Sequence, residues 1–281
     1  MAYIPIIMSE KEADHMDVVE NQFSQLKSAI EIQSMMGVMG EDLGTNNPIA
    51  YSPISSPITL GTKRLPYFVS QDARGILKIN DDVDTDYKIY IQGLALFHYN
   101  PNEIPLTSIE YTAHNHYYLN GRNLQYILEG GAIMLNQSDL GETMKVAPSI
   151  SVEERMEGDV KYITIYWNVP IFVGVEGKKI TPQHYTDYYI RTNYTDSEPP
   201  VTLEQDIEIY SKHLDLWEKY FTNENNGLLY EYMIEGNDFI EVLSPDGEKL
   251  VITAKGAAVL EACITAIKVG AQTGAGIIET G

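Results

Sequence analysis

Residues 9–36 read SEKEADHMDVVENQFSQLKSAIEIQSMM, and the spacing of their apolar side chains decides how the chain begins. These side chains recur at alternating intervals of three and four residues, so they share one narrow stripe of an α-helix. The stripe consists of Met16, Val19, Phe23, Leu26 and Ile30. We predict an amphipathic helix that packs either on the chain's own sheet or against another helix as a coiled-coil seam.

Local signals predict where this helix begins and ends. Ser9 followed by Glu12 forms a capping box, in which each side chain bonds a backbone N–H at the other's position. Met35 and Met36 are expected to extend the apolar stripe, and Gly37 and Gly40 are expected to end the helix. We therefore expect an N-terminal stalk helix within residues 1–40.

An apolar segment, Tyr3 to Met8, stands directly before the charged part of this helix. One interpretation is a short strand or a disordered tail. The other is the remnant of a membrane anchor, with Met1 and Ala2 foreign to the natural chain. No run of roughly 18 apolar residues occurs in the sequence, so the chain as given is not expected to span a membrane. On the second interpretation, the native protein is anchored through a segment absent here.

From residue 58 the apolar period changes from 3.6 to two, which is typical of β-strands. Residues 58–195 predict a β-sandwich or jelly-roll-like antiparallel domain, because the strands do not alternate with helices. Gly130 and Gly131 either turn a hairpin or mark a bulge. Residues 200–281 are expected to complete the sandwich or to form a second small sheet.

The C-terminal segment contains one predicted short helix, near residues 211–222, with Ser211 as its N-cap. Residues 228–236 are read as a strand, residues 244–249 (SPDGEK) as a hairpin turn, and residues 257–270 as a strand, with a helix as the alternative. The apolar face of the short helix consists of Leu214, Trp217 and Phe221. The fold class is thus mainly β, with an N-terminal amphipathic helix.

The composition excludes some classes of function. A net charge of −21, from 19 basic and 40 acidic residues, argues against nucleic acid as a partner, because phosphate backbones are bound by clustered Lys and Arg. Cys263 is the single cysteine, so no internal disulfide and no cysteine-rich metal site can form. Twenty tyrosines against six phenylalanines favour sheets with one wet face.

The stretch YTAHNHYYLNG brings His114, Asn115 and His116 together. It matches the HNH nucleases in letters only, since their three residues are spread over a ββα fold. On a strand the two histidines would point to one face, and His98 could stand opposite them, whereas zinc requires three or four ligands. A metal-dependent hydrolase centred on these three histidines is the weakest of our hypotheses, and we assign no catalytic, cofactor or metal residue.

A second acidic segment resembles the start of a calcium loop, with Asp82, Asp84 and Asp86 at alternate positions. Tyr87 stands where an EF-hand needs glycine, so the segment is not an EF-hand. A solvated acidic turn is the favoured interpretation, because Asp and Asn are common in turns. A looser calcium site remains the alternative.

Two features bear on carbohydrates. Asn136 and Asn193 stand in glycosylation sequons, which matter only if the protein is exposed outside the cell. Two tyrosine-rich polar segments, residues 114–121 and 186–195, could stack on sugar rings. An outward sheet face with wet hydroxyl groups explains the same composition.

The order of these segments resembles a family of archaeal membrane-anchored surface proteins with a type IV pilin-like N-terminus. The residues that carry the resemblance, spread over positions 8–270, are Leu60, Gly61, Pro66, Phe68, Gly75, Leu77, Asn115, Tyr117, Tyr126, Gly130, Gly131, Gln137, Trp217, Tyr220 and Phe221. Two departures are the missing hydrophobic helix and the position of Leu128-Glu129, where the family places its acidic residue slightly earlier. The family implies no established activity.

Three functions therefore compete. The first is a non-enzymatic extracellular domain of an archaeal pilin-like or cell-envelope protein, with a role in adhesion or surface structure. It implies a cell-surface location, other envelope proteins or surface glycans as partners, self-association through the N-terminal helix, and no cofactor. A carbohydrate-binding module is the alternative, and the metal-dependent hydrolase comes last.

Overall fold

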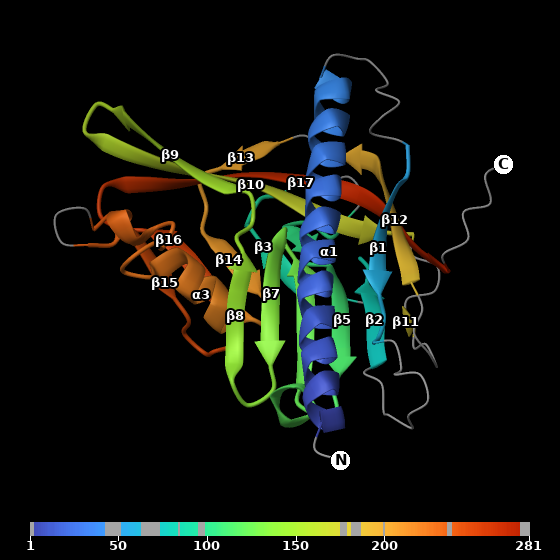
Figure 1. Ribbon diagram of the computed structural model, residues 1–281. Coiled ribbons are helices and arrows are strands. Elements are labelled where there is room, and N and C mark those ends of the chain that lie inside the picture. The colour runs from blue at the N-terminus through green and yellow to red at the C-terminus, as the bar shows by residue number, and fades with distance from the viewer. Residues whose placement is uncertain are drawn as a thin grey trace.

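The computed structural model describes residues 3–42, 52–62, 74–83, 85–94, 99–174, 179–180, 187–198, 200–234 and 238–275. Over these residues the chain forms a long helix α1, a short helix α3 and three β-sheets (Figure 1). The expected mainly β fold with an N-terminal helix is confirmed.

Sheet A has the strand order β1-β12-β17-β10-β9, and β13 also pairs with β17. Its strands are β1 (Ile54–Thr59), β9 (Ile150–Glu157), β10 (Val160–Val173), β12 (Asp187–Ser197), β13 (Val201–Leu203) and β17 (Ala258–Ala275). The long strand predicted near residues 257–270 is confirmed. Its pairing departs from the antiparallel expectation, because β10 and β17 run parallel from Lys161 opposite Ala258 to Val173 opposite Gly270. A parallel pair needs a long crossover, which β11 to β16 and α3 provide here.

Sheet B has the order β11-β2-β5-β6-β7-β8. Its strands are β2 (Arg74–Asn80), β5 (Ser108–His114), β6 (Asn123–Glu129), β7 (Ala132–Gln137), β8 (Gly141–Val146) and β11 (Lys179–Ile180). Gly130 and Gly131 turn the β6–β7 hairpin with φ angles of 56° and 84°, so the hairpin alternative is confirmed. A two-residue turn with both φ angles positive suits glycine and matches the twist of the strands.

Sheet C has the order β15-β16-β14-β3-β4. Its strands are β3 (Lys88–Tyr90), β4 (Glu103–Pro105), β14 (Ile207–Tyr210), β15 (Ile240–Leu243) and β16 (Leu250–Ala254). The β15–β16 hairpin confirms the turn predicted at residues 244–249. The strand predicted at residues 228–236 is wrong, because the chain there turns into a 3-10 helix, Tyr230–Tyr232. A second 3-10 helix, η1, spans Tyr118–Asn120.

Helix α1 spans Tyr3–Asp42 and lies across sheets A and B (Figure 1). All five residues of the predicted stripe are at most 3% exposed, and they pack on the chain's own strands. The predicted ends are wrong, since Ser9, Glu12 and Gly37 all lie inside the helix. A residue with a side chain could not take the place of Gly37, because its Cβ atom would lie 2.4 Å from the ring of Tyr194. Close packing, rather than helix termination, accounts for this glycine.

Helix α3 spans Leu214–Thr222, within the predicted range. Its N-cap residue is His213, so the assignment of Ser211 as N-cap is wrong. Ser211 Oγ accepts a hydrogen bond from the His213 backbone N–H and donates one to the Glu129 carboxylate. The serine therefore shapes the turn before the helix and links it to sheet B.

The described residues form two hydrophobic cores. The first lies between sheets A, B and C and helix α3, and it contains the Trp167 and Trp217 rings with centroids 5.2 Å apart. The second lies between α1 and sheets A and B. Strands β10 and β17 serve both cores, because alternate residues of a strand point to opposite faces. Ile171 belongs to the first core, for example, and its neighbour Phe172 to the second.

Replacing Trp217 tests how much the first core contributes to stability. Its side chain is fully buried, and its Nε1–H donates to Glu129. We expect Trp217→Ala to lower the free energy of unfolding by about 3–5 kcal/mol, because it leaves a cavity and an acceptor without its donor. Urea denaturation checks this, with Trp217→Phe as the milder control that keeps most of the ring. A nearly unchanged midpoint for the alanine variant would contradict the burial of this ring.

Candidate functional site: an apolar groove beside helix α1

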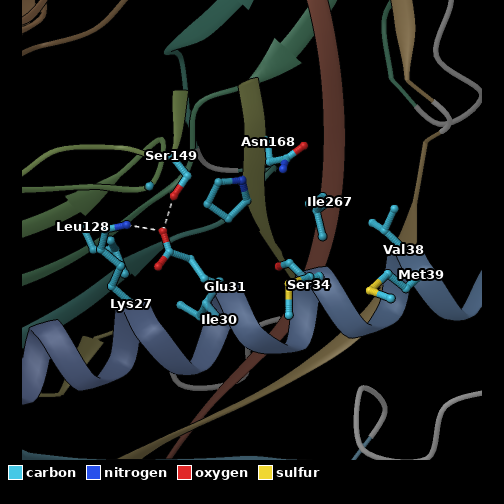
Figure 2. Close-up of a pocket in the computed structure, with 13 residues that line it drawn as sticks. Lys27, Ile30, Glu31, Ser34, Val38, Met39, Leu128, Ser149, Asn168 and Ile267 are labelled. Carbon is cyan, nitrogen blue, oxygen red and sulfur yellow. Dashed lines mark hydrogen bonds and ion pairs between the residues drawn. The ribbon is translucent and has the colours of Figure 1, made fainter. Parts of the chain in front are cut away.

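A groove of about 370 Å³ opens between the C-terminal half of α1 and the two sheets beneath it (Figure 2). Its lining comes from the helix, from the β6–β7 hairpin, from the segment before β9, and from β10 and β17. The residues are Lys27, Ile30, Glu31, Ser34, Met35, Val38, Met39, Leu128, Gly131, Ser149, Asn168, Pro170 and Ile267. Most of this lining is apolar, and its members come together only in the folded chain.

The parallel pair β10–β17 forms the floor of the groove. On the face toward α1, Phe172 stands beside Val269 and both are fully buried. The next row toward the start of the strands, Pro170 beside Ile267, lines the groove. One row further, Asn168 is exposed, and Tyr166 beyond it is 38% exposed. The same sheet face thus passes from helix-covered to groove to open surface.

The charges at the groove balance each other. Lys27, which is 6% exposed, forms an ion pair with Glu31 one helical turn away. Ser149 Oγ donates to the same Glu31 carboxylate over 2.5 Å. The dashed lines in Figure 2 trace these two contacts. A ligand entering the groove therefore meets apolar walls and a neutralised polar group.

A ridge of apolar side chains borders the groove on α1. Ile32, Met35 and Met39 are 46%, 57% and 54% exposed. We call these three residues the α1 ridge. Large apolar side chains clustered on a surface are typical of docking sites. The sequence predicted that Met35 extends the buried stripe, and this is wrong, because its side chain points to solvent while Met36 packs on the second core.

Polar contacts hold the other half of α1 on sheet B, and they explain the stretch around His116. The Glu12 carboxylate accepts hydrogen bonds from the backbone N–H groups of His116, Tyr117 and Tyr118, at 3.0, 2.8 and 2.6 Å. Successive N–H groups of this kind form an anion-binding nest. The chain around His116 therefore binds a carboxylate of its own helix.

The structure does not bring a metal-binding set together around these histidines. His114 ends β5, and its Nδ1 lies 3.1 Å from the Asn123 side-chain oxygen. His116 is exposed in the bend beyond β5, and His98 lies outside the described residues. No group of three metal-ligating side chains occurs in the part of the chain that the structure describes.

His15 is a second polar contact of α1. Its Nε2 lies 2.8 Å from the Tyr111 hydroxyl group in the second core. Burial lowers the pKa of His15 from 6.5 to about 4, because a charged imidazolium would lose its hydration there. The histidine is therefore neutral in the folded protein at ordinary pH.

A buried polar cluster joins sheet B to α3. Glu129 is 3% exposed and accepts hydrogen bonds from Ser211 and Trp217. Burial raises the pKa of Glu129, while the bond from Ser211 and the nearby His213 oppose that rise. His213 Nδ1 lies 2.9 Å from Glu142. Each group has a structural partner, and the Ser211 hydroxyl contacts the His213 backbone rather than its ring, so the cluster is not a Ser–His–Glu triad.

The other predicted polar positions are spread apart. Asp82 accepts a long hydrogen bond of 3.4 Å from the Tyr99 hydroxyl group, and its pKa is raised chiefly by burial. Asp86 lines a polar hollow nearby, and Asp84 lies outside the described residues. Pro66 and Phe68, two residues of the family resemblance, also lie outside them.

The two sequon asparagines lie in strands. Asn136 in β7 donates to Glu142 over 2.7 Å, across the β7–β8 hairpin. Asn193 is half-buried in β12 opposite Gly270, and its Nδ2 donates to the Tyr194 carbonyl. Both carboxamides are thus engaged within the fold, and their glycosylation stays a prediction.

Comparison with known proteins found no match among family models, curated proteins or solved structures. None of the helices in the described part of the chain is long and apolar enough to cross a bilayer.

Glu12 tests the attachment of α1. We expect Glu12→Ala to lower the free energy of unfolding by roughly 1.5–3 kcal/mol, because three backbone donors lose a charged acceptor. Glu12→Gln keeps an acceptor oxygen and should cost less. Glu10→Gln removes an exposed charge from the same helix and serves as control. Equal stability of all three variants by urea titration would contradict a structural role for the nest.

The lowered pKa of His15 predicts that the free energy of unfolding depends on pH. A folded-state pKa near 4, below the ordinary 6.5, means that its contribution to stability is complete above pH 6.5 and is lost as the pH falls toward 4. At one pKa unit per 1.36 kcal/mol, the loss amounts to roughly 3 kcal/mol. His15→Gln should remove this part of the acid destabilisation, and His116→Gln should not. Urea titrations at neutral and acidic pH measure the difference, and parallel pH profiles for wild type and His15→Gln would refute it.

Proposed function

We propose that this chain is a non-enzymatic, β-rich extracellular domain of a cell-envelope protein, of the archaeal pilin-like kind that its sequence resembles. Its role is structural or adhesive at the cell surface. The observation that carries the proposal is the position of α1, which lies along the β-sheets from Met8 to Gly37 with buried side chains throughout. A helix built into a β-rich head in this way joins whatever precedes it rigidly to the head.

The contacts of α1 support a rigid attachment of the helix to the head. Besides Glu12 and His15, Gln22 bonds Thr59 of β1, and Gln33 bonds the backbone and side chain of Thr192 in β12. These bonds fix the helix along its axis, whereas apolar packing alone would tolerate small shifts. The N-terminal end of α1 lies at one edge of the head (Figure 1). A membrane segment continuing the helix would leave the head at that edge.

A carbohydrate-binding module remains the alternative proposal, and one hollow on sheet A favours it. Arg155, Thr164, Tyr166 and Glu261 border a space of about 350 Å³. An exposed tyrosine beside charged hydrogen-bonding groups suits a sugar ring and its hydroxyl groups. Of the tyrosine-rich segments singled out in the sequence, residues 186–195 contribute less, because Tyr194 is fully buried.

The surface location is tested on intact cells of the source organism. We expect a protease added outside to cut the exposed β9–β10 hairpin near Gly158, while a cytoplasmic marker protein stays whole. Membrane fractions should release the full-length protein only with detergent. Protection of the chain until the cells are lysed would refute the proposal. For the alternative, a glycan array with the isolated domain and its Tyr166→Ala variant decides, and no binding on any glycan would exclude it.

A further inference from the structure

We propose that the groove beside α1 binds a second copy of this chain. In this two-fold contact, the α1 ridge of each copy enters the groove of the other. The inference rests on the proposed surface function, for which it names the partner. It is argued from the charge, the chemistry and the continuity of the surface around the groove.

Charge favours contact between like chains at this place. The chain carries a net charge of −21, so two copies repel each other over most of their surface. Between Ser28 and Gly40 of α1, however, the sequence contains one charged residue, Glu31, and it is paired with Lys27. The ridge and groove thus form a neutral area in an acidic protein. A basic partner would need unpaired acidic groups to bind, and this area offers none, because Glu31 is paired with Lys27.

The chemistry of ridge and groove is complementary. Met35 and Met39 belong to both, because their exposed sides form the ridge and their inner sides line the groove. Unbranched methionine side chains adapt to irregular apolar surfaces. A surface that carries both a ridge and its receiving groove allows an isologous contact, in which the same residues meet from both copies.

The exposed face of sheet A beside the groove enlarges the surface that a second copy can contact. Beyond Pro170, the face of β10 continues with Asn168 and Tyr166, which are exposed and which neither α1 nor α3 covers. A second helix can therefore lie on the sheet next to α1. The axes of two helices that pack side by side lie about 10 Å apart.

The size of the ridge predicts a weak contact. Three half-exposed side chains present a few hundred Å², against about 800 Å² per partner in a standard interface. Free copies should therefore associate only at high concentration. Copies held on one surface experience a much higher effective concentration, so the same weak contact becomes sufficient there.

Sedimentation velocity over a concentration series tests the contact. We expect reversible dimers in the wild type and at least a tenfold higher dissociation constant in the double variant Met35→Glu, Met39→Glu, because the neutral area becomes charged in both copies. Val18→Glu is the matched control, since Val18 is 45% exposed on the same helix and lies outside the groove. A wild type that stays monomeric at every concentration, or equal association of double variant and control, would overturn the proposal.

Cross-linking tests the geometry. In a Cys263→Ser background, one copy carries Met39→Cys and the other Asn168→Cys, and a short bismaleimide joins cysteines that lie close. We expect the mixed adduct from this pair and none when Val18→Cys replaces Met39→Cys. Equal adducts from both pairs would overturn the ridge-in-groove contact. A monomeric protein that protease still reaches on intact cells would disprove this inference alone, whereas a dimeric protein hidden inside the cell would disprove the surface function alone.

Discussion

The packing of helix α1 across sheets A and B is the constraint on which the rest of the structure depends. The second hydrophobic core exists only because the helix covers inward-facing residues of both sheets. A single apolar stripe achieves this along its whole length, and polar contacts at Glu12, Gln22 and Gln33 fix the register of helix and strands. Apolar burial supplies most of the stability, and the polar bonds select one arrangement among similar ones.

The parallel pair β10–β17 is the second determinant, since its two faces serve different purposes. One face closes the first core with Trp167 and Ile264. The other is covered by α1 near Phe172 and becomes groove and then open surface toward Tyr166. The helix covers only part of a long sheet face, and the groove lies where that cover ends. A candidate docking site thus arises from the mismatch between one helix and a broad sheet.

The stretch around His116 shows why residue type alone misleads. Two histidines on either side of an asparagine suggest metal chemistry, yet the groups that bind there are backbone N–H donors, which every sequence contains. They bind Glu12, a residue that itself suggested a helix cap. The helix-cap pattern at Glu12 and the histidine pattern at residues 114–116 are each other's partners, about a hundred positions apart in the chain. Local rules therefore assigned the right polar character to each residue and the wrong partner.

By itself, the sequence determined the amphipathic helix, the mainly β class and the β15–β16 turn, and it reduced Gly130-Gly131 to a hairpin turn or a bulge. These features depend on periodicity and turn chemistry within a few residues, which a linear reading contains. Only the tertiary structure decided the parallel pairing of β10 with β17, the continuation of α1 past Gly37 and the groove. Each of these depends on contacts between distant segments, such as the Tyr194 ring against Gly37, and non-local packing overrides local propensity wherever the two compete.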